Sequence, residues 1–188
     1  MSQANSYKIA VLATDGFELT ELVEPVNALR AAGATVQVLA PHGGEIQGMN
    51  HHEKAQKIKV DLELSKASAK DFDALVLPGG VANPDELRLD RMAISFIKDF
   101  SDADKPIAAI CHGPWTLIEA GAVQGKKMTS WPSLQTDLRN AGATWVDQEV
   151  VIDGKLVTSR KPGDLPAFNR EFLKVLTTTD ILPSERTL

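Results

Sequence analysis

The sequence has few of the features that mark secreted, membrane-bound or nucleic-acid-binding proteins. Its 188 residues include one cysteine, Cys111, which cannot form an internal disulfide. No apolar run approaches the ~20 residues of a membrane-spanning helix. Lys and Arg number 20 against 25 Asp and Glu, without a basic block, which argues against nucleic-acid and membrane partners. The N-terminus lacks the pattern of a signal peptide, so we expect a cytoplasmic protein.

The overall composition is that of a folded protein. Hydrophobic residues make up 43% and charged residues 24% of the chain, with 13 glycines and 10 prolines. These values exclude low-complexity and mostly disordered chains. The length suits one hydrophobic core, so we expect a single domain over residues 1–188.

Short apolar runs alternate with helical patterns along the chain. We expect strands at 7–13, 35–40, 74–78 and 106–110, a short strand at 58–60, and an otherwise irregular excursion at 41–57. We expect helices at 18–32, 90–100, 113–120, 133–141 and 164–176. Asp153-Gly154 predicts a hairpin between strands 144–152 and 155–158. The alternation predicts an α/β fold, a mostly parallel sheet with helices on both faces and a C-terminal antiparallel hairpin.

The most informative segment surrounds the cysteine. Ala108-Ala109-Ile110 ends a predicted strand, and Gly113-Pro114 begins a predicted helix, which places Cys111 on the turn between them. Small residues around a nucleophile on a strand-to-helix turn are typical of a nucleophile elbow. The helix N-terminus there favours a thiolate and would lower the pKa of the thiol. The alternative is an inert cysteine buried in the core.

Other candidate groups follow neighbouring strands, where α/β proteins bind their ligands. The N–H groups of Gly79 and Gly80, with that of His112, would form an oxyanion hole, although two glycines are also an ordinary turn. Glu18 follows the first strand and would exchange a proton or a hydrogen bond with the thiol. Its alternative role is that of a helix N-terminal acid, which complements the helix dipole.

The histidines narrow the choice of a catalytic base. The four are His42, His51, His52 and His112, so none follows His112, and the distal histidine of glutamine amidotransferases is absent. The base is then His112, an earlier histidine or a carboxylate such as Glu18, and Asp85 is a candidate to orient His112. The adjacent His51 and His52 suit a solvated loop better than a metal site, and we expect no metal or organic cofactor.

Four segments resemble one known family. KIAVLATDGFELTE, DALVLPGGVANPDELR, PIAAICHGPWTLIEAG and GATWVDQEVVIDGKLVTSRKPGDLPAF are similar to the ThiJ/PfpI superfamily of class I glutamine-amidotransferase-like proteins, over about residues 7–176. The similarity is greatest to PfpI-type intracellular proteases, general stress proteins and deglycases. It implies a flavodoxin-like three-layer fold, Cys111 as nucleophile, Glu18 as the acid contacting the thiol and His112 as base.

The same resemblance implies an assembly. In PfpI-like hexamers a carboxylate of a neighbouring subunit completes the site, and Asp85 occupies that position here, so we expect a homo-oligomer, a dimer or a hexamer. Trp131 stands where archaeal members carry a tyrosine. An indole cannot supply a phenolic proton, which weakens the prediction of peptidase activity.

Three functions fit these residues. The first is a cysteine-dependent hydrolase acting on reactive dicarbonyls, such as glyoxal and methylglyoxal, or on their early glycation adducts. The second is an intracellular cysteine peptidase. The third is a redox-sensing or holding stress protein without enzymatic activity, in which Cys111 is oxidised to a sulfenic or sulfinic acid.

Overall fold

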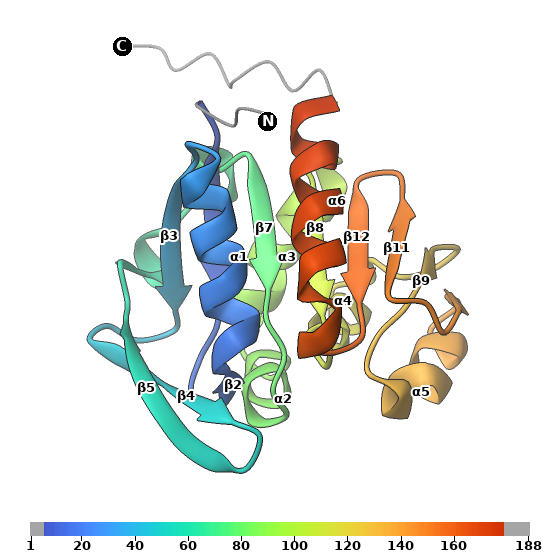
Figure 1. Ribbon diagram of the computed structural model, residues 1–188, viewed down its shortest axis with the longest axis horizontal. Coiled ribbons are helices and arrows are strands. Elements are labelled where there is room, and N and C mark those ends of the chain that lie inside the picture. Colours follow the sequence, from blue (N-terminus) through green and yellow to red (C-terminus); the bar gives the residue numbers. More distant parts are fainter. Residues whose placement is uncertain (1–5, 179–188) are drawn as a thin grey trace.

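A seven-stranded sheet forms the centre of the molecule. A computed structural model describes residues 6–178 (Figure 1). The strand order is β11-β12-β8-β7-β1-β3-β6. The strands span Lys8–Leu12 (β1), Thr35–Ala40 (β3), Leu62–Glu63 (β6), Ala74–Leu77 (β7), Ile107–Ile110 (β8), Val150–Asp153 (β11) and Leu156–Ser159 (β12). Every neighbouring pair is parallel except β11 and β12. The predicted mostly parallel sheet and its C-terminal hairpin are therefore confirmed.

Helices cover both faces of this sheet (Figure 1). The described part of the chain forms the α-helices α1 (Leu19–Ala31), α2 (Ala82–Leu87), α3 (Arg91–Asp102), α4 (Pro114–Glu119), α5 (Gln135–Asn140) and α6 (Leu165–Thr178). Helices α1 and α6 lie side by side on one face, and α3 and α4 on the other. Strand β1 contributes side chains to the hydrophobic cores on both faces of the sheet. Ile9 and Val11 pack on the face covered by α1 and α6, and Ala10 and Leu12 pack on the face covered by α3 and α4.

Local sequence accounts for α3 as an example. The side chain of Asp90 accepts hydrogen bonds from the backbone N–H groups of Met92 and Ala93, which caps the helix. Ala93, Phe96, Ile97 and Phe100 recur at helical spacing and are buried against the sheet. The predicted helix at 90–100 is therefore confirmed, with its end two residues later.

The segment predicted to be irregular is a β-hairpin. Strands β4 (Glu45–Asn50) and β5 (Glu53–Lys59) pair antiparallel, and β4 also pairs with the short β2 (Phe17–Glu18). The prediction of an irregular segment at 41–57 was wrong because the strands are mostly polar and their turn has no glycine. The short strand expected at 58–60 is the end of β5. Instead His51 adopts the left-handed conformation, with φ 55°. The hairpin projects beyond the carboxyl ends of the parallel strands (Figure 1).

Two other predicted elements were placed differently. Residue 144 does not begin the C-terminal hairpin, because β10 (Thr144–Trp145) pairs with β9 (Lys127–Met128) in a separate two-stranded sheet. The predicted helix 133–141 starts as a 3-10 turn, Pro132–Leu134, before α5. Helix α2, after Gly80, was not predicted. 3-10 turns also occupy Leu64–Lys66, Ala69–Asp71 and Pro162–Asp164.

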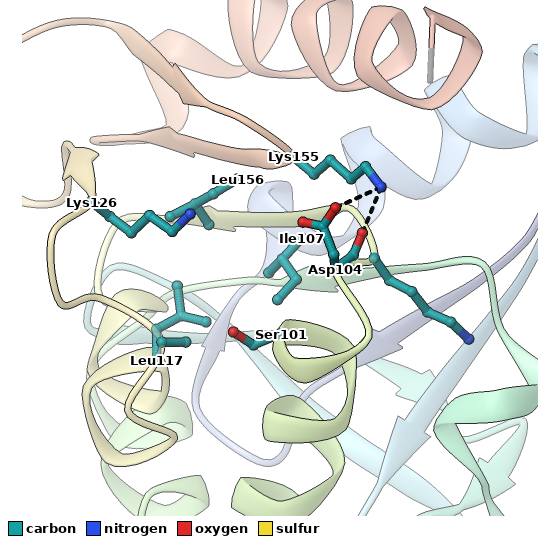
Figure 2. A pocket seen from close by; sticks show the side chains of 9 residues that line it. Ser101, Asp104, Ile107, Leu117, Lys126, Lys155 and Leu156 are labelled. Carbon is teal, nitrogen blue, oxygen red and sulfur yellow. Dashed lines mark hydrogen bonds and ion pairs between the residues drawn. The ribbon is translucent and has the colours of Figure 1, made fainter. Parts of the chain in front are cut away.

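A small hollow lies near the start of β8, at the opposite end of the strand from Cys111. Figure 2 shows Lys155 beside Asp104, where its Nζ donates to the backbone oxygen at 2.8 Å and lies 2.9 Å from the carboxylate. The cavity of about 40 Å³ is too small for an organic substrate.

None of the helices within residues 6–178 has the length and apolar character needed to cross a membrane.

Candidate active site

Cys111 lies on a strained turn between β8 and α4. Its φ of 61° is in the left-handed region, which is uncommon for residues other than glycine. The Cys111 N–H donates to the carbonyl oxygen of Ser159 at 3.1 Å. A Cβ at Gly113 would lie 2.5 Å from the carbonyl oxygen of Leu77, so the turn has room only for glycine there. The strand-to-helix turn predicted around Cys111 is present, with the strain expected of a nucleophile elbow.

A cleft of about 700 Å³ opens at this turn, at the carboxyl ends of the parallel strands. Its volume suits a small organic molecule. Cys111 and His112 belong to its wall, together with residues from α1, the β4–β5 turn, the loop after β7 and later loops. These other lining residues are Gly16, Glu18, Glu21, Met49, His51, His52, Gly80, Val81, Ala82, Trp131 and Pro162.

The carboxyl group beside the thiol belongs to Glu21, in the first turn of α1. It hydrogen-bonds the thiol of Cys111, and its Oε2 accepts a hydrogen bond from the Gly79 N–H at 2.9 Å. The Glu21 side chain is fully buried, and this burial raises its pKa to about 8. The remaining oxygen, Oε1, is buried and accepts no hydrogen bond from the described residues. These features suit a carboxyl group that is protonated at neutral pH.

The thiol contact expected of Glu18 is therefore made by Glu21. Glu18 ends β2 and lies in the wall of the same cleft, where its Oε2 accepts a hydrogen bond from the His51 N–H at 3.0 Å. Three residues further along, one turn of α1 brings Glu21 to the elbow. Sequence reasoning missed Glu21 because both carboxyl groups fall at the start of the same helix. The sequence signal that could have identified Glu21 is its place among the residues of the buried face of α1.

The imidazole of His112 lies on another side of the sulfur. Its Nδ1 is 3.2 Å from Sγ of Cys111, and its Nε2 is 3.5 Å from Oγ of Ser133. The ring stacks on Trp131 and meets Trp115 edge-on. Burial lowers the pKa of His112 to about 4, so the imidazole is neutral at pH 7 and able to accept a proton.

The pKa of the Cys111 thiol is raised, contrary to the expectation from the sequence. Burial is the main cause, and a negative charge on Glu21 adds to it. The backbone N–H groups of Gly80 and His112 act in the opposite direction but do not outweigh burial. Helix α4 has only six residues, and its N-terminus does not compensate for the loss of hydration. The resting site therefore holds a neutral thiol beside a neutral imidazole.

Only part of the expected oxyanion hole is free to bind an oxyanion. The Gly79 N–H is occupied by Glu21, so the expectation that Gly79 supplies a donor was wrong. The N–H groups of Gly80 and His112 both point to Sγ of Cys111. Gly79 is still required for space, because a Cβ there would lie 2.5 Å from Oε2 of Glu21 and 2.6 Å from Cβ of Cys111.

Asp85 is not brought to His112 within this chain. It lies on the exposed surface of α2, and the described neighbour of His112 Nε2 is Ser133. An acid from Asp85 would therefore have to come from a second copy of the chain. His51 and His52, which the sequence places on a solvated loop, are exposed and contribute to the wall of the cleft. Within residues 6–178, no three His, Cys, Asp or Glu side chains gather as metal ligands would.

Comparison with known proteins places this geometry in a family. The profile of the DJ-1/PfpI family matches residues 7–175. The chain is 44% identical over 169 residues to "Deglycase TK1284" of Thermococcus kodakarensis, covering 90% of this chain and 99% of that protein. It is 46% identical over 171 residues to "Putative cysteine protease YraA" of Bacillus subtilis, covering 91% and 99%. The crystal structure of Drosophila melanogaster DJ-1beta superposes with a TM-score of 0.84 at 30% identity, covering 93% and 92%. The flavodoxin-like fold is thus confirmed, and the chain belongs to the DJ-1/PfpI family.

Proposed function

We propose that the protein is a cysteine-dependent hydrolase that acts on reactive dicarbonyls or on their early adducts with amines and thiols. The observation that carries the proposal is the surroundings of Sγ of Cys111. A neutral imidazole nitrogen lies 3.2 Å away, and a buried carboxyl group hydrogen-bonds the thiol. A base for the thiol proton and an acid for a developing oxygen charge are therefore both present. Relatives named as deglycases support the same reading.

The first step is addition of sulfur to an aldehyde carbon. Sγ of Cys111 attacks the aldehyde of methylglyoxal while Nδ1 of His112 accepts the thiol proton. The N–H groups of Gly80 and His112 stabilise the oxyanion, which then takes the proton and becomes a hemithioacetal. With an aminocarbinol adduct, the same attack displaces the amine, which leaves with one proton.

The second step moves hydrogen within the bound substrate. A base removes the proton from the former aldehyde carbon, and a proton is returned to the neighbouring carbon, which produces a lactoyl thioester. His112 and Glu21 are the groups positioned for these transfers. Water then hydrolyses the thioester to lactate and free Cys111. The aldehyde carbon is oxidised and the ketone carbon reduced, so the net reaction adds one water and consumes no external oxidant.

The test compares the wild type with Cys111→Ala and Cys111→Ser. Lactate formed from methylglyoxal is quantified by chromatography, beside hydrolysis of a fluorogenic peptide mixture. The proposal predicts lactate formation in the wild type and loss of at least a hundredfold in both variants, with melting temperatures close to the wild type. Peptide cleavage without lactate formation would favour the peptidase suggested by the name of YraA.

Absence of both activities, with stress protection that survives oxidation of Cys111, would favour the redox-sensing protein. The cytoplasmic location and the homo-oligomer with a site completed by Asp85 remain parts of this proposal. Size-exclusion chromatography with light scattering measures the oligomeric state directly.

A further inference from the structure

We propose that Glu18 selects substrates that carry a positive charge near the reactive carbon, such as an ammonium or a guanidinium group. The inference rests on the proposed function and specifies the substrate that the same cleft prefers. It also gives Glu18 a role in binding, separate from the contact with the thiol that Glu21 makes.

The charges around the cleft support this selection. None of the residues that line it is a lysine or an arginine. Its two carboxyl groups differ, because Glu21 is fully buried behind the sulfur and protonated at neutral pH. Glu18 is therefore the carboxylate that gives the described wall of the cleft its negative charge. An anionic substrate would meet this charge without a compensating cation in the wall.

Glu18 itself is a nearly buried carboxylate that lacks a strong cationic partner. Its side chain is only 9% exposed, and among the described residues its ion-pair partner is Nδ1 of His51, 3.9 Å from Oε2. The His51 side chain is 76% exposed, so this pairing is weak. A carboxylate that has lost most of its hydration gains more from a cationic partner than one in bulk water. A positively charged substrate would supply that partner.

The fold holds Glu18 in place for this role. Strand β2 pairs with β4, with Glu18 opposite Met49, and the turn of the hairpin directs the His51 N–H to Oε2. The left-handed backbone of His51 sets the direction of the turn. His51 is thus a positioning residue, because its backbone orients the carboxylate toward the cleft.

An aromatic side chain adds a second attraction for cations. Trp131 lines the same cleft and is 39% exposed, although His112 stacks on its ring. The uncovered part of an indole attracts ammonium and guanidinium groups through its π electrons. Glu18 and Trp131 therefore both favour the same class of substrate.

The first experiment varies only the charge of the substrate. Methylglyoxal forms hemithioacetals with thiocholine, N-acetylcysteamine and 3-mercaptopropionate, which are cationic, neutral and anionic around the same reactive carbon; the quaternary ammonium of thiocholine cannot cyclise onto the aldehyde. We expect kcat/KM of the wild type to favour the cationic over the anionic compound by about tenfold. Glu18→Gln should reduce the ratio to within about twofold. Glu45→Gln, which removes an equal charge from the exposed far end of β4, should keep it.

Three kinetic results would overturn the inference. A wild type whose kcat/KM does not favour the cationic compound contradicts it. So does a Glu18→Gln variant that loses activity equally for all three compounds, because Glu18 would then act in catalysis or folding rather than in charge selection. A ratio that survives in Glu18→Gln also contradicts it.

A second experiment is independent of turnover. Cys111 is the only cysteine, so intact mass reports its modification by methanethiosulfonates that carry an ammonium, a methyl or a sulfonate group. Rates are divided by those of a neutral model thiol. Faster modification by the ammonium reagent, lost in Glu18→Gln, supports charge selection even if lactate is not formed and the proposed function fails. Equal rates in an enzyme that does form lactate reject charge selection and leave the proposed function standing.

Discussion

The carboxyl group of Glu21 hydrogen-bonds the thiol of Cys111, and each group affects the protonation of the other. Both are buried, and each would be destabilised by a negative charge on its neighbour. Because the two sites interact, they titrate as a pair. At neutral pH the protonated carboxyl group can donate a hydrogen bond to sulfur as negative charge develops there. In the proposed reaction the thiolate would therefore form only as the substrate is attacked, with His112 as the acceptor of the proton.

Alkylation of Cys111 tests this coupling. Below pH 7 Glu21 is neutral, so the wild type and Glu21→Gln should react with iodoacetamide at similar rates. Above pH 8 the Glu21 carboxylate opposes the thiolate, and we expect Glu21→Gln to react several times faster than the wild type at pH 9. Glu24→Gln, on the exposed face of α1, is the matched control. Equal rates at pH 9 would show that Glu21 does not titrate beside the sulfur.

The stability of the protein should depend on pH through Glu21. Its pKa is about 8 in the folded state against an ordinary value of 4.5, so between these values the folded state retains a proton that the unfolded state releases. The free energy of unfolding then falls as pH rises from 4.5 to 8, by up to about 1.4 kcal/mol per pH unit from this group. Glu21→Gln lacks this contribution.

Urea denaturation at several pH values measures the difference between the two proteins. The lowered pKa of His112 acts in the opposite direction, below about pH 6.5, but both proteins share it. The stability of Glu21→Gln relative to the wild type should therefore increase from pH 5 to pH 8. A constant difference would mean that Glu21 is ionised throughout this range.

The lack of space for a side chain at Gly79 predicts the effect of a substitution there on stability and activity. In Gly79→Ala the new Cβ would lie 2.5 Å from Oε2 of Glu21 and 2.6 Å from Cβ of Cys111. We expect a loss of about 1–3 kcal/mol of stability and a marked loss of activity. Gly163→Ala is the control, because nothing lies within 4 Å of the added methyl group. Thermal unfolding of both variants measures the difference. Similar melting temperatures for Gly79→Ala and Gly163→Ala would contradict the prediction that the added methyl group is crowded at position 79.

Asp85 allows a test of the composite site. If Asp85 of a second copy orients His112, Asp85→Asn should lower kcat by about a hundredfold, at the lower end of the usual range for general acid–base catalysis. Glu86→Gln changes the adjacent exposed carboxylate of α2 and should have little effect. Light scattering and activity are measured together during dilution. Full activity in a dilute monomer would reject the composite site.

The elbow could be predicted from sequence because its causes are local. A run of small and β-branched residues ends at Ile110, and Gly113 and Pro114 stop the strand and start the helix. The required backbone conformation at Cys111 follows from a turn of this kind. The central strands were predicted for a similar reason, because strands buried on both faces are almost wholly apolar.

Other features depended on contacts between distant segments. The hairpin of β4 and β5 escaped prediction because its strands are mostly polar, and because β4 also pairs with β2, whose residues lie 31 positions earlier in the chain. The raised pKa of Cys111 was missed because burial depends on all the elements around the cleft. Neither property belongs to a short stretch of sequence.

The amino-acid sequence by itself determined the turn that carries Cys111, the proposed nucleophile, as well as the parallel sheet and the edge at which the cleft lies. Only the tertiary structure decided which carboxyl group meets the thiol. Glu18 and Glu21 are three residues apart at the start of one helix, and the packing of α1 against the sheet directs Glu21 to Cys111 and leaves Glu18 in the wall of the cleft. The direction of a helix relative to a distant strand is set by packing of the whole core, which no local pattern contains.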